Sequence, residues 1–486
     1  MRRVCLAFLA FLLLTTACAS ERPTLDDSAS REVDAVDLDV DESAEDDVDT
    51  RPVLRLAVGP NLSLDPADVV PASLANRVVA DLLYEGLTTL DEDGQPLPGL
   101  ADRWFISDDR LTWTFVLADT LVDGRGAPVT ARDVKASLER IAARGRADHG
   151  ATALTAITGW EDRMDGAAGG VAGLSAPDAT TLVVRLDSPF ELLLDVLASP
   201  AFGITGEGDG GLRTTGAFAP TDDPAIFEAV SATESIRAVE LINHVDGPAG
   251  AMAADQVDWA VLSIGDSSTG LAADILRQPL ELEVAIVARS PIESVRLGLL
   301  DALEPLLLAT AVDGLTARTV AAPDDAGERP AAAPLDLPDG QLAALGDEIA
   351  SQLEAAGIDV LVASSGADEF ATRVADGDAL LFPIVIAGGT GPASALLRIA
   401  VPGGTDDVFG PENEGRSELA DAVVTELDSD QRALFVAALE QSLIDDGFLL
   451  PVGQFEVRVA IGRRLDGLRH RSDGTLDVSG LEFAAS

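Results

Sequence analysis

The sequence predicts a globular α/β protein, and three observations lead to this class. Hydrophobic residues make up 47% of the 486-residue chain, which is enough to form a large buried core. Short alternating apolar patterns, typical of strands, recur along the first half, and the second half alternates helix-like with strand-like segments. At about 100–200 residues per domain, this length allows two to four domains or lobes.

In the first half, alternation of apolar and polar residues predicts strands over three segments. These are residues 53–58, 112–117 and 181–186. A helix is expected to begin at Thr130, because Asp133 stands three residues later in the position of a capping box. A second, apolar helix is expected to start at Pro189.

In the second half, a helix over residues 342–353 is predicted to end at Gly357, with a strand over 358–363 behind it. A short helix and a continuously apolar strand over 380–387 follow, and this strand pattern is typical of buried parallel sheets. The spacing of strand, helix and strand predicts a right-handed crossover unit. A helix over 434–444 and a strand over 455–459 come next, whereas the Pro-, Ala- and Asp-rich residues 321–340 predict a loop.

The N-terminus has the pattern of a processing signal, predicted over residues 1–17. Arg2 and Arg3 precede an apolar run that is too short to span a bilayer. Small residues then lead to Cys18, as in the lipobox of bacterial lipoproteins, whose signal is cut before an acylated cysteine. The alternative is an ordinary secretory signal with an incidental cysteine. Residues 18–51 are acidic and lack aromatic residues, so we expect a disordered tether.

Composition excludes several classes of function. The chain carries 33 Lys+Arg against 83 Asp+Glu, a net charge of −50, which argues against a nucleic-acid partner. Two Cys and three well-separated His predict no metal site, and no cofactor is expected. Residues 206–211 fit the dinucleotide pattern G-x-G-x-x-G, but Glu207 and Asp209 would repel a pyrophosphate, so we interpret them as a surface turn. Motifs of hydrolases are absent, and we expect no enzyme activity.

One stretch of about sixty residues carries a specific set of motifs. In order, they are Leu83-Tyr84-Glu85-Gly86-Leu87, Asp91-Glu92-Asp93-Gly94, Pro98-Gly99-Leu100-Ala101, Trp104, Ser107-Asp108-Asp109, Leu111-Thr112-Trp113-Thr114-Phe115, Asp123-Gly124, Pro128-Val129-Thr130-Ala131-Arg132-Asp133-Val134 and Ser137-Leu138-Glu139-Arg140. This series resembles the extracellular solute-binding proteins of ABC importers, family 5, of the oligopeptide, dipeptide and nickel type. Weaker similarities, including Gln256-Val257-Asp258-Trp259-Ala260, extend it over residues 52–486.

The resemblance implies a two-lobed periplasmic-binding-protein-like fold of the class II type, with mixed sheets and a ligand cleft between the lobes. Lobe 1 is expected over residues 52–265, with an inserted subdomain near 80–190, and lobe 2 over 266–450. Residues 451–486 would return to pack on lobe 1. Trp104, Trp113 and Trp259 lie in strand-like patterns and are expected in the core.

Candidate cleft residues follow strands at their carboxyl ends, where open α/β sheets bind ligands. Asn61, Leu62 and Ser63 come after the first strand, and Gly389 and Thr390 come after residues 380–387. The alternative is that these residues only form turns. The family's peptide clamp has Trp and Asp in a segment that here reads Gly388-Gly389-Thr390-Gly391-Pro392, so the usual contact with a peptide N-terminus is in doubt.

The function implied is that of a lipid-anchored receptor on the outer face of the bacterial cytoplasmic membrane. It would capture an oligopeptide-like or other small polar solute by lobe closure and pass it to an ABC permease, and we expect it to act as a monomer. The alternative is a degenerate or sensory lipoprotein module that is not coupled to transport. A surface hydrolase on the same scaffold is disfavoured because its motifs are missing. About −42 of the net charge falls on the folded body, which indicates a solubility or salt adaptation as much as a preference for cationic ligands.

Overall fold

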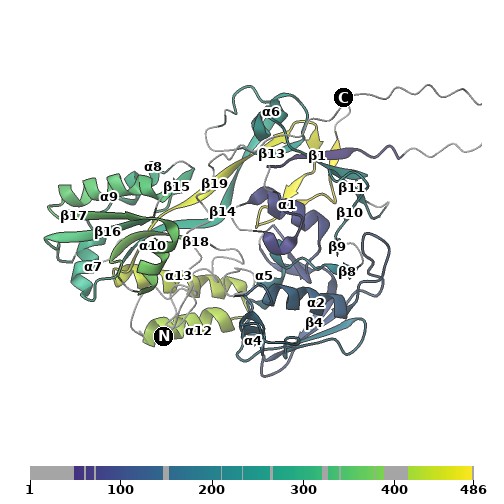
Figure 1. Cartoon of the computed structure of the whole chain (residues 1–486), viewed down its shortest axis with the longest axis horizontal. Helices are drawn as coiled ribbons and strands as arrows, with labels where there is room; N and C mark the ends of the chain where they lie inside the picture. The colour runs from purple at the N-terminus through teal and green to yellow at the C-terminus, as the bar shows by residue number, and fades with distance from the viewer. Residues whose placement is uncertain are drawn as a thin grey trace, which may run out of the picture.

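The structure, a computed structural model, describes residues 49–483 with several internal gaps. The gaps are 60–61, 70–72, 93, 146–152, 209–210, 232–233, 263–265, 267, 313, 320–326, 339–340, 377 and 388–413. The predicted signal, Cys18 and nearly all of the predicted tether therefore lie outside the described residues. Figure 1 shows two lobes joined by long strands, with mixed sheets covered by helices.

A nine-stranded sheet runs through both lobes and determines how the chain is arranged. Its order is β10 (Phe218–Pro220), β11 (Ile226–Ala229), β12 (Ala238–Ile242), β1 (Val53–Ala57), β13 (Trp259–Leu262), β19 (Leu449–Gly462), β14 (Ala273–Ala288) and β18 (Leu381–Ala387), with β15 (Leu315–Ala317) also paired to β19. The predicted first strand is confirmed as β1, whose Leu54 and Leu56 are fully buried. β1 pairs in parallel with β12 and β13, so its carboxyl end lies between two neighbours.

The two longest strands, β14 and β19, pass from one lobe to the other (Figure 1). They pair antiparallel from Ala273 opposite Gly462 to Val287 opposite Leu449. Their register shifts between Pro279 and Glu283 and again between Val284 and Ala285. An irregularity of this kind bends a strand and increases its local twist, so it lets one sheet serve two lobes.

Next to the large sheet, the first lobe contains a smaller unit with its own core. Its sheet has the order β4 (Ala101–Ile106), β5 (Thr112–Leu117), β7 (Thr181–Arg185) and β6 (Leu174–Ser175). The helices of this unit are α2 (Ala131–Ala142), α4 (Trp160–Met164) and α5 (Leu193–Leu197). The capping box at the start of α2 is confirmed, since the backbone N–H of Thr130 donates to Asp133 Oδ2 at 2.9 Å. The apolar helix expected to start at Pro189 starts four residues later, at Leu193, as α5.

The tryptophans confirm the expected packing. Trp113 and Trp259 are buried, and their rings lie in separate hydrophobic clusters. Trp104 is half-buried and packs against the cluster that contains Trp113. These aromatic rings therefore stabilise the two cores of the first lobe.

The remaining elements of the first lobe surround these two sheets. They are α1 (Leu74–Leu83), α6 (Gly247–Ala253) and the strand pairs β2 (Thr88–Leu90) with β3 (Pro96–Pro98), β8 (Gly206–Gly208) with β9 (Gly211–Arg213), β20 (Leu465–Asp466) with β23 (Glu482–Phe483) and β21 (Arg469–His470) with β22 (Leu476–Asp477). The segment interpreted as a surface turn is thus part of the hairpin of β8 and β9.

The second lobe contains a short parallel sheet and several helices. Its elements are α7 (Glu293–Leu300), α8 (Pro305–Thr310), β16 (Ala332–Pro338), α9 (Ala344–Ala355), β17 (Asp359–Ser365), α10 (Ala367–Asp376), α12 (Glu414–Thr425) and α13 (Ser429–Asp445). Helix α9 is followed by Gly357 at φ +84°, as the sequence predicts. Left-handed backbone of this kind favours glycine, because a Cβ would be strained there.

Two predictions for this lobe are wrong. Residues 332–338, expected in a loop, form β16, which pairs in parallel with β17. Among the described residues β16 is paired on one side only, and this leaves an edge where prolines fit without losing a ladder hydrogen bond. The strand over 380–387 was expected to be parallel, but β18 pairs antiparallel with β14, so the parallel crossover is β16–α9–β17 instead.

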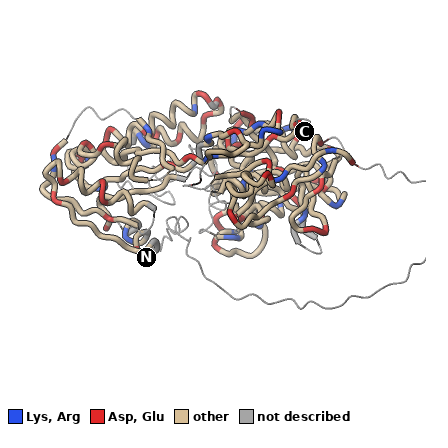
Figure 2. Tube along the Cα trace, turned by 90° about the horizontal axis from the view of Figure 1, so that it is seen from above, with Lys and Arg blue, Asp and Glu red and all other residues tan. Residues whose placement is uncertain are grey.

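The predicted lobe and subdomain boundaries at 52–265, 80–190, 266–450 and 451–486 stay predictions. Charge is distributed over both lobes, and Figure 2 shows acidic and basic positions interspersed along the chain. In the part of the chain that the structure describes, no helix is both long and apolar enough to cross a membrane.

A buried carboxylate ties three distant segments of the first lobe together. Asp258, just before β13, accepts hydrogen bonds from the backbone N–H of Arg55 at 2.9 Å and from its Nε at 3.1 Å. Arg464, in the turn after β19, donates from Nε to the same carboxylate at 2.5 Å. Asp258 is fully buried, so its charge depends on these partners.

We expect Asp258→Ala to lower the free energy of unfolding by about 3 kcal/mol, because it leaves the two guanidinium groups without their shared partner. This is the low end of the usual range, since Arg464 is partly exposed to water. Urea denaturation measures the change. The control is Asp255→Asn, at an exposed position with φ +55° that asparagine tolerates, and it should change stability by less than about 0.5 kcal/mol. Equal changes in the free energy of unfolding would contradict the role of Asp258 in holding Arg55 and Arg464.

Candidate binding site

The loop after β1 contains the candidate residues that the structure describes. Leu62 is half-buried and packs against the main core, and Ser63 follows it. Asn61, Gly389 and Thr390 lie outside the described residues. The structure therefore places Leu62 and Ser63 beyond the carboxyl end of β1, and their role in a binding site stays a prediction.

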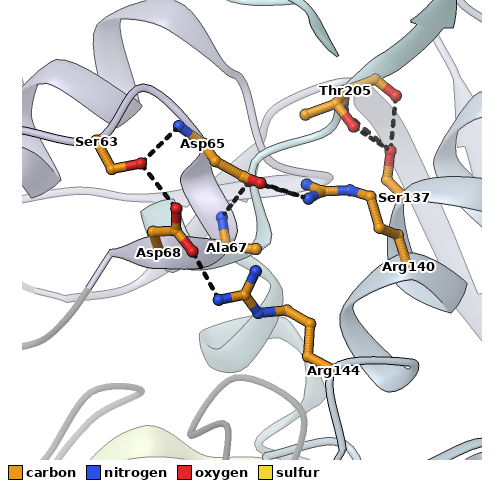
Figure 3. Close-up of polar contacts among 8 residues, drawn as sticks. All are labelled: Ser63, Asp65, Ala67, Asp68, Ser137, Arg140, Arg144 and Thr205. Carbon is orange, nitrogen blue, oxygen red and sulfur yellow. Dashed lines mark hydrogen bonds and ion pairs between the residues drawn. The ribbon is translucent and has the colours of Figure 1, made fainter. Parts of the chain in front are cut away.

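Ser63 is the centre of a small polar network in this loop (Figure 3). Its hydroxyl donates to Asp68 Oδ2 at 2.8 Å and accepts from the backbone N–H of Asp65 at 3.2 Å. Asp65 in turn accepts from the backbone N–H of Ala67 at 2.9 Å and so caps a short 3₁₀ helix, Pro66–Asp68. Local bonds of this type fix the path of a loop.

Two arginines hold the loop, Arg140 on α2 and Arg144 in the turn that follows this helix (Figure 3). Nη1 of Arg140 lies 3.0 and 2.8 Å from the two carboxylate oxygens of Asp65. Nη2 of Arg144 lies 2.6 Å from Asp68 Oδ1. Arg144 lies two residues beyond Ala142, the last residue of α2, so both guanidinium groups reach the loop from the C-terminal end of this helix.

The position of α2 itself is fixed by a buried contact. The hydroxyl of Ser137 donates to the backbone carbonyl of Thr205 at 2.7 Å and accepts from its N–H at 2.9 Å (Figure 3). Ser137 is buried, so both bonds are shielded from water. The loop after β1 is thus held by α2, and α2 is itself held by the backbone of Thr205.

The electrostatics of the loop follow from these contacts. Burial disfavours the charged form of Asp68, but the hydrogen bonds from Ser63 and Arg144 outweigh it and lower the pKa of this carboxyl. Burial raises the pKa of the Tyr84 phenol to about 12, with Asp65 adding to the shift and Arg140 opposing it. At neutral pH Asp68 in the loop is therefore ionised, and the buried phenol of Tyr84 at the end of α1 is neutral.

The chemistry that the loop offers a ligand is restricted. A hydroxyl has one donor and two acceptor lone pairs, and Ser63 already uses its donor and one lone pair. Ser63 can therefore accept one further hydrogen bond from a ligand N–H or O–H. Within the described residues, no partner is seen for the backbone N–H groups of Leu62, Ser63 and Leu64, and the Leu64 side chain is exposed.

Sequence reasoning found the loop but missed the residues that hold it, namely Asp65, Asp68, Arg140 and Arg144. The signal was limited to two arginines near the end of the helix predicted to begin at Thr130. In the described part of the chain, no group of three or more His, Cys, Asp or Glu side chains is placed to hold a metal ion.

The fold is that of two-lobed binding proteins. The chain superposes on the unliganded open form of the periplasmic murein tripeptide-binding protein MppA with a TM-score of 0.73. The alignment covers 89% of this chain and 98% of that structure, at 19% sequence identity. The predicted α/β fold with two lobes is therefore confirmed.

The family resemblance is confirmed by sequence as well. Residues 95–234 match the family model described as bacterial extracellular solute-binding proteins, family 5 Middle. The chain is 36% identical to the Escherichia coli periplasmic murein peptide-binding protein MppA over 143 residues, which are 29% of this chain and 26% of that protein. It is 31% identical to the Bacillus subtilis dipeptide-binding protein DppE over 129 residues, 25% of this chain and 22% of DppE. The sequence match thus spans about a quarter of the length of these relatives.

We expect Ser63→Ala to raise the pKa of Asp68 towards its ordinary value, since a hydrogen bond to the charged form is lost. NMR titration of the side-chain carboxyl groups measures this shift. A carboxyl with a lowered pKa stabilises the fold above its unfolded pKa, and the stabilisation is lost as the pH falls through the lowered value. The variant should therefore lose less stability on acidification than the parent protein.

Ser107→Ala is the matched control, because Ser107 donates to Asp109 in an exposed turn and lowers the pKa of that carboxyl. It should raise the pKa of Asp109 and leave that of Asp68 unchanged. An Asp68 pKa that does not respond to Ser63→Ala would show that Arg144 alone sets it.

Proposed function

We propose that the protein is a solute-binding receptor of an ABC importer that captures an oligopeptide-like solute between its lobes and hands it to a membrane permease. The observation that carries this proposal is the 36% identity over 143 residues to a murein peptide-binding protein. The proposal includes closure of the lobes over the ligand, action as a monomer, and neither a catalytic step nor a cofactor.

The loop after β1 supports a peptide-like ligand. A peptide carries backbone N–H groups and carbonyls in alternation, and these can pair with main-chain groups at the edge of a binding site. Ser63 accepts from a donor, the backbone amides of residues 62–64 can donate to carbonyls, and exposed Leu64 offers an apolar contact. In the second lobe, Gly389 and Thr390 are proposed to supply the opposite wall.

Membrane attachment is proposed through Cys18, with residues 19–51 as the tether. This segment carries 13 acidic and 3 basic residues, and its self-repulsion favours an extended chain. An extended tether lets the folded body stand away from the membrane and reach a permease nearby. This places the protein on the outer face of the cytoplasmic membrane.

We expect short peptides, but not sugars or single amino acids, to raise the melting temperature of the purified protein. A ligand at about 100 times its Kd stabilises the folded state by about 2.7 kcal/mol. A thermal-shift screen with peptide pools, amino acids, sugars and chelated metals measures the effect. If no pool shifts the melting temperature, the alternative of a degenerate lipoprotein that has lost its binding cleft gains support.

The screen is made specific to the candidate site by repeating it with Ser63→Ala. Loss of one hydrogen bond of about 1 kcal/mol should weaken peptide affinity several-fold. Ser107→Ala serves again as the control and should leave affinity unchanged. If the parent protein and both variants bound the peptide with equal affinity, Ser63 would not be part of the binding site.

We expect Cys18→Ser to release the protein from membranes into the soluble fraction, because lipid attachment requires the thiol. Fractionation of cells that express each form, with detection by antibody, measures this. Cys5→Ser, within the predicted signal, is the control and should leave the protein on the membrane. Membrane retention of the Cys18→Ser variant would contradict the lipid anchor.

A further inference from the structure

The two lobes meet at a second place, apart from the strands β14 and β19. Figure 1 shows α12 and α13 of the second lobe beside α5 of the first, on the side of the molecule away from those strands. The contact involves the turn between β4 and β5, residues 190–195, and the facing ends of α12 and α13. We call this contact the lobe junction.

The lobe junction is built like a protein interior. Leu192 and Val423 come from different lobes, are almost completely buried and pack against each other. Three partly buried side chains enclose them: Phe190, Phe435 and Val436. An apolar contact of this kind excludes water from the polar groups beside it.

Backbone groups are bridged across the lobe junction as well. The N–H of Glu191 donates to the carbonyl of Val424 at 2.7 Å. Nη1 of Arg110 donates to the carbonyl of Thr425, also at 2.7 Å. Both carbonyls lie at the C-terminal end of α12, where helix carbonyls lack partners within the helix and carry partial negative charge.

One ion pair crosses the lobe junction in a largely buried position. Nη2 of Arg432 on α13 lies 3.0 Å from Asp195 Oδ2 on α5, and Nη1 donates to the carbonyl of Glu426 at 3.1 Å. Arg432 is 9% exposed. Burial raises the pKa of the Asp195 carboxyl, and Arg432 opposes this effect.

Glu191 is the unusual member of this contact. Its side chain is fully buried, yet neither carboxylate oxygen has a hydrogen-bond partner in the described part of the chain. The nearest cation is Nη1 of Arg110, at 3.7 Å from Oε1, which is too long for a hydrogen bond. Burying a charged carboxylate without hydrogen bonds costs free energy, and protonation of the carboxylate removes most of that cost.

We propose that the lobe junction restrains the relative motion of the two lobes, and that protonation of Glu191 tightens this restraint. When the junction separates, water reaches Glu191 and stabilises its charged form. Contact between the lobes is therefore linked to binding of one proton. This inference goes beyond the proposed function, because it concerns the free protein and needs no ligand.

The direction of the pH effect follows from the surroundings of Glu191. Burial raises the pKa of its carboxyl, while Arg110 and Arg432 lower it and Glu426 raises it further. A raised pKa in the assembled junction means that the contact is favoured at low pH and weakens as the pH rises through that value. Asp195 faces the same contact, but its carboxylate is paired with Arg432, which opposes the effect of burial on its pKa, whereas the Glu191 carboxylate has no hydrogen-bond partner among the described residues.

The experiment measures the distance between the lobes in the full chain without ligand. Spin labels are placed at Arg132→Cys on α2 and Glu354→Cys on α9, both exposed and away from the junction, in a background with Cys5→Ser and Cys18→Ser. Pulsed electron resonance then gives the distance distribution between about pH 4 and pH 8. We expect a narrow distribution at low pH that broadens as the pH rises.

Glu191→Gln keeps the shape of the side chain and removes its charge, so its distribution should stay narrow across the whole range. Asp81→Asn is the control, because burial also raises the pKa of Asp81, to about 7, but it lies on α1 and is bound to Arg471 within the first lobe. The distance distribution of this control variant should broaden as the pH rises, as that of the parent protein does. The proposal is overturned if the distance distribution of Glu191→Gln broadens with pH like that of the parent protein, or if the distribution of the parent does not change with pH.

Arg432→Ala tests the restraint without reference to the proton. Loss of the ion pair with Asp195 should broaden the distribution at every pH, including the lowest. Circular dichroism at each pH confirms that the labelled variants remain folded. A folded Arg432→Ala variant with the distribution of the parent would show that the junction does not restrain the lobes.

Discussion

The antiparallel pairing of β14 with β19 is the interaction on which the rest of the structure depends. One end of this pair completes the sheet of the first lobe beside β13, and the other end carries β18 in the second lobe. The two lobes are therefore parts of one hydrogen-bonded sheet. The register of the pair shifts between Pro279 and Glu283 and again between Val284 and Ala285, and an irregular ladder twists and bends more easily than a regular one.

Local signals predicted the elements that depend on neighbouring residues. Thr130 and Asp133 start α2 through bonds within one turn, and Gly357 follows α9 because its backbone conformation favours glycine. The wrong predictions concern elements whose pairing depends on segments that are distant in the sequence. The apolar residues 380–387 fit a parallel or an antiparallel strand equally well, and only the presence of β14 beside them decides for the antiparallel pairing.

The candidate site shows the same division between local and distant causes. Ser63 was expected near a ligand because it follows a strand at its carboxyl end, which is a property of the sheet. Arg140 and Arg144 hold the neighbouring Asp65 and Asp68, and their positions depend on how α2 is rotated about its axis. That rotation is set by the buried bonds between Ser137 and Thr205, 68 residues apart, and no pattern near either residue indicates the pairing.

The effect of the many acidic residues depends more on which of them pair with arginines than on the net charge of the chain. Arginines pair with buried and half-buried carboxylates, for example Arg55 with Asp258, Arg432 with Asp195, and Arg318 with both Glu283 and Glu440. These pairs neutralise carboxylates at structural positions and leave the surplus of acidic groups on the surface. Water and salt screen surface charges beyond about 8 Å at physiological ionic strength. The net charge of −50 therefore favours solubility, whereas ligand choice depends on the few groups that line the site.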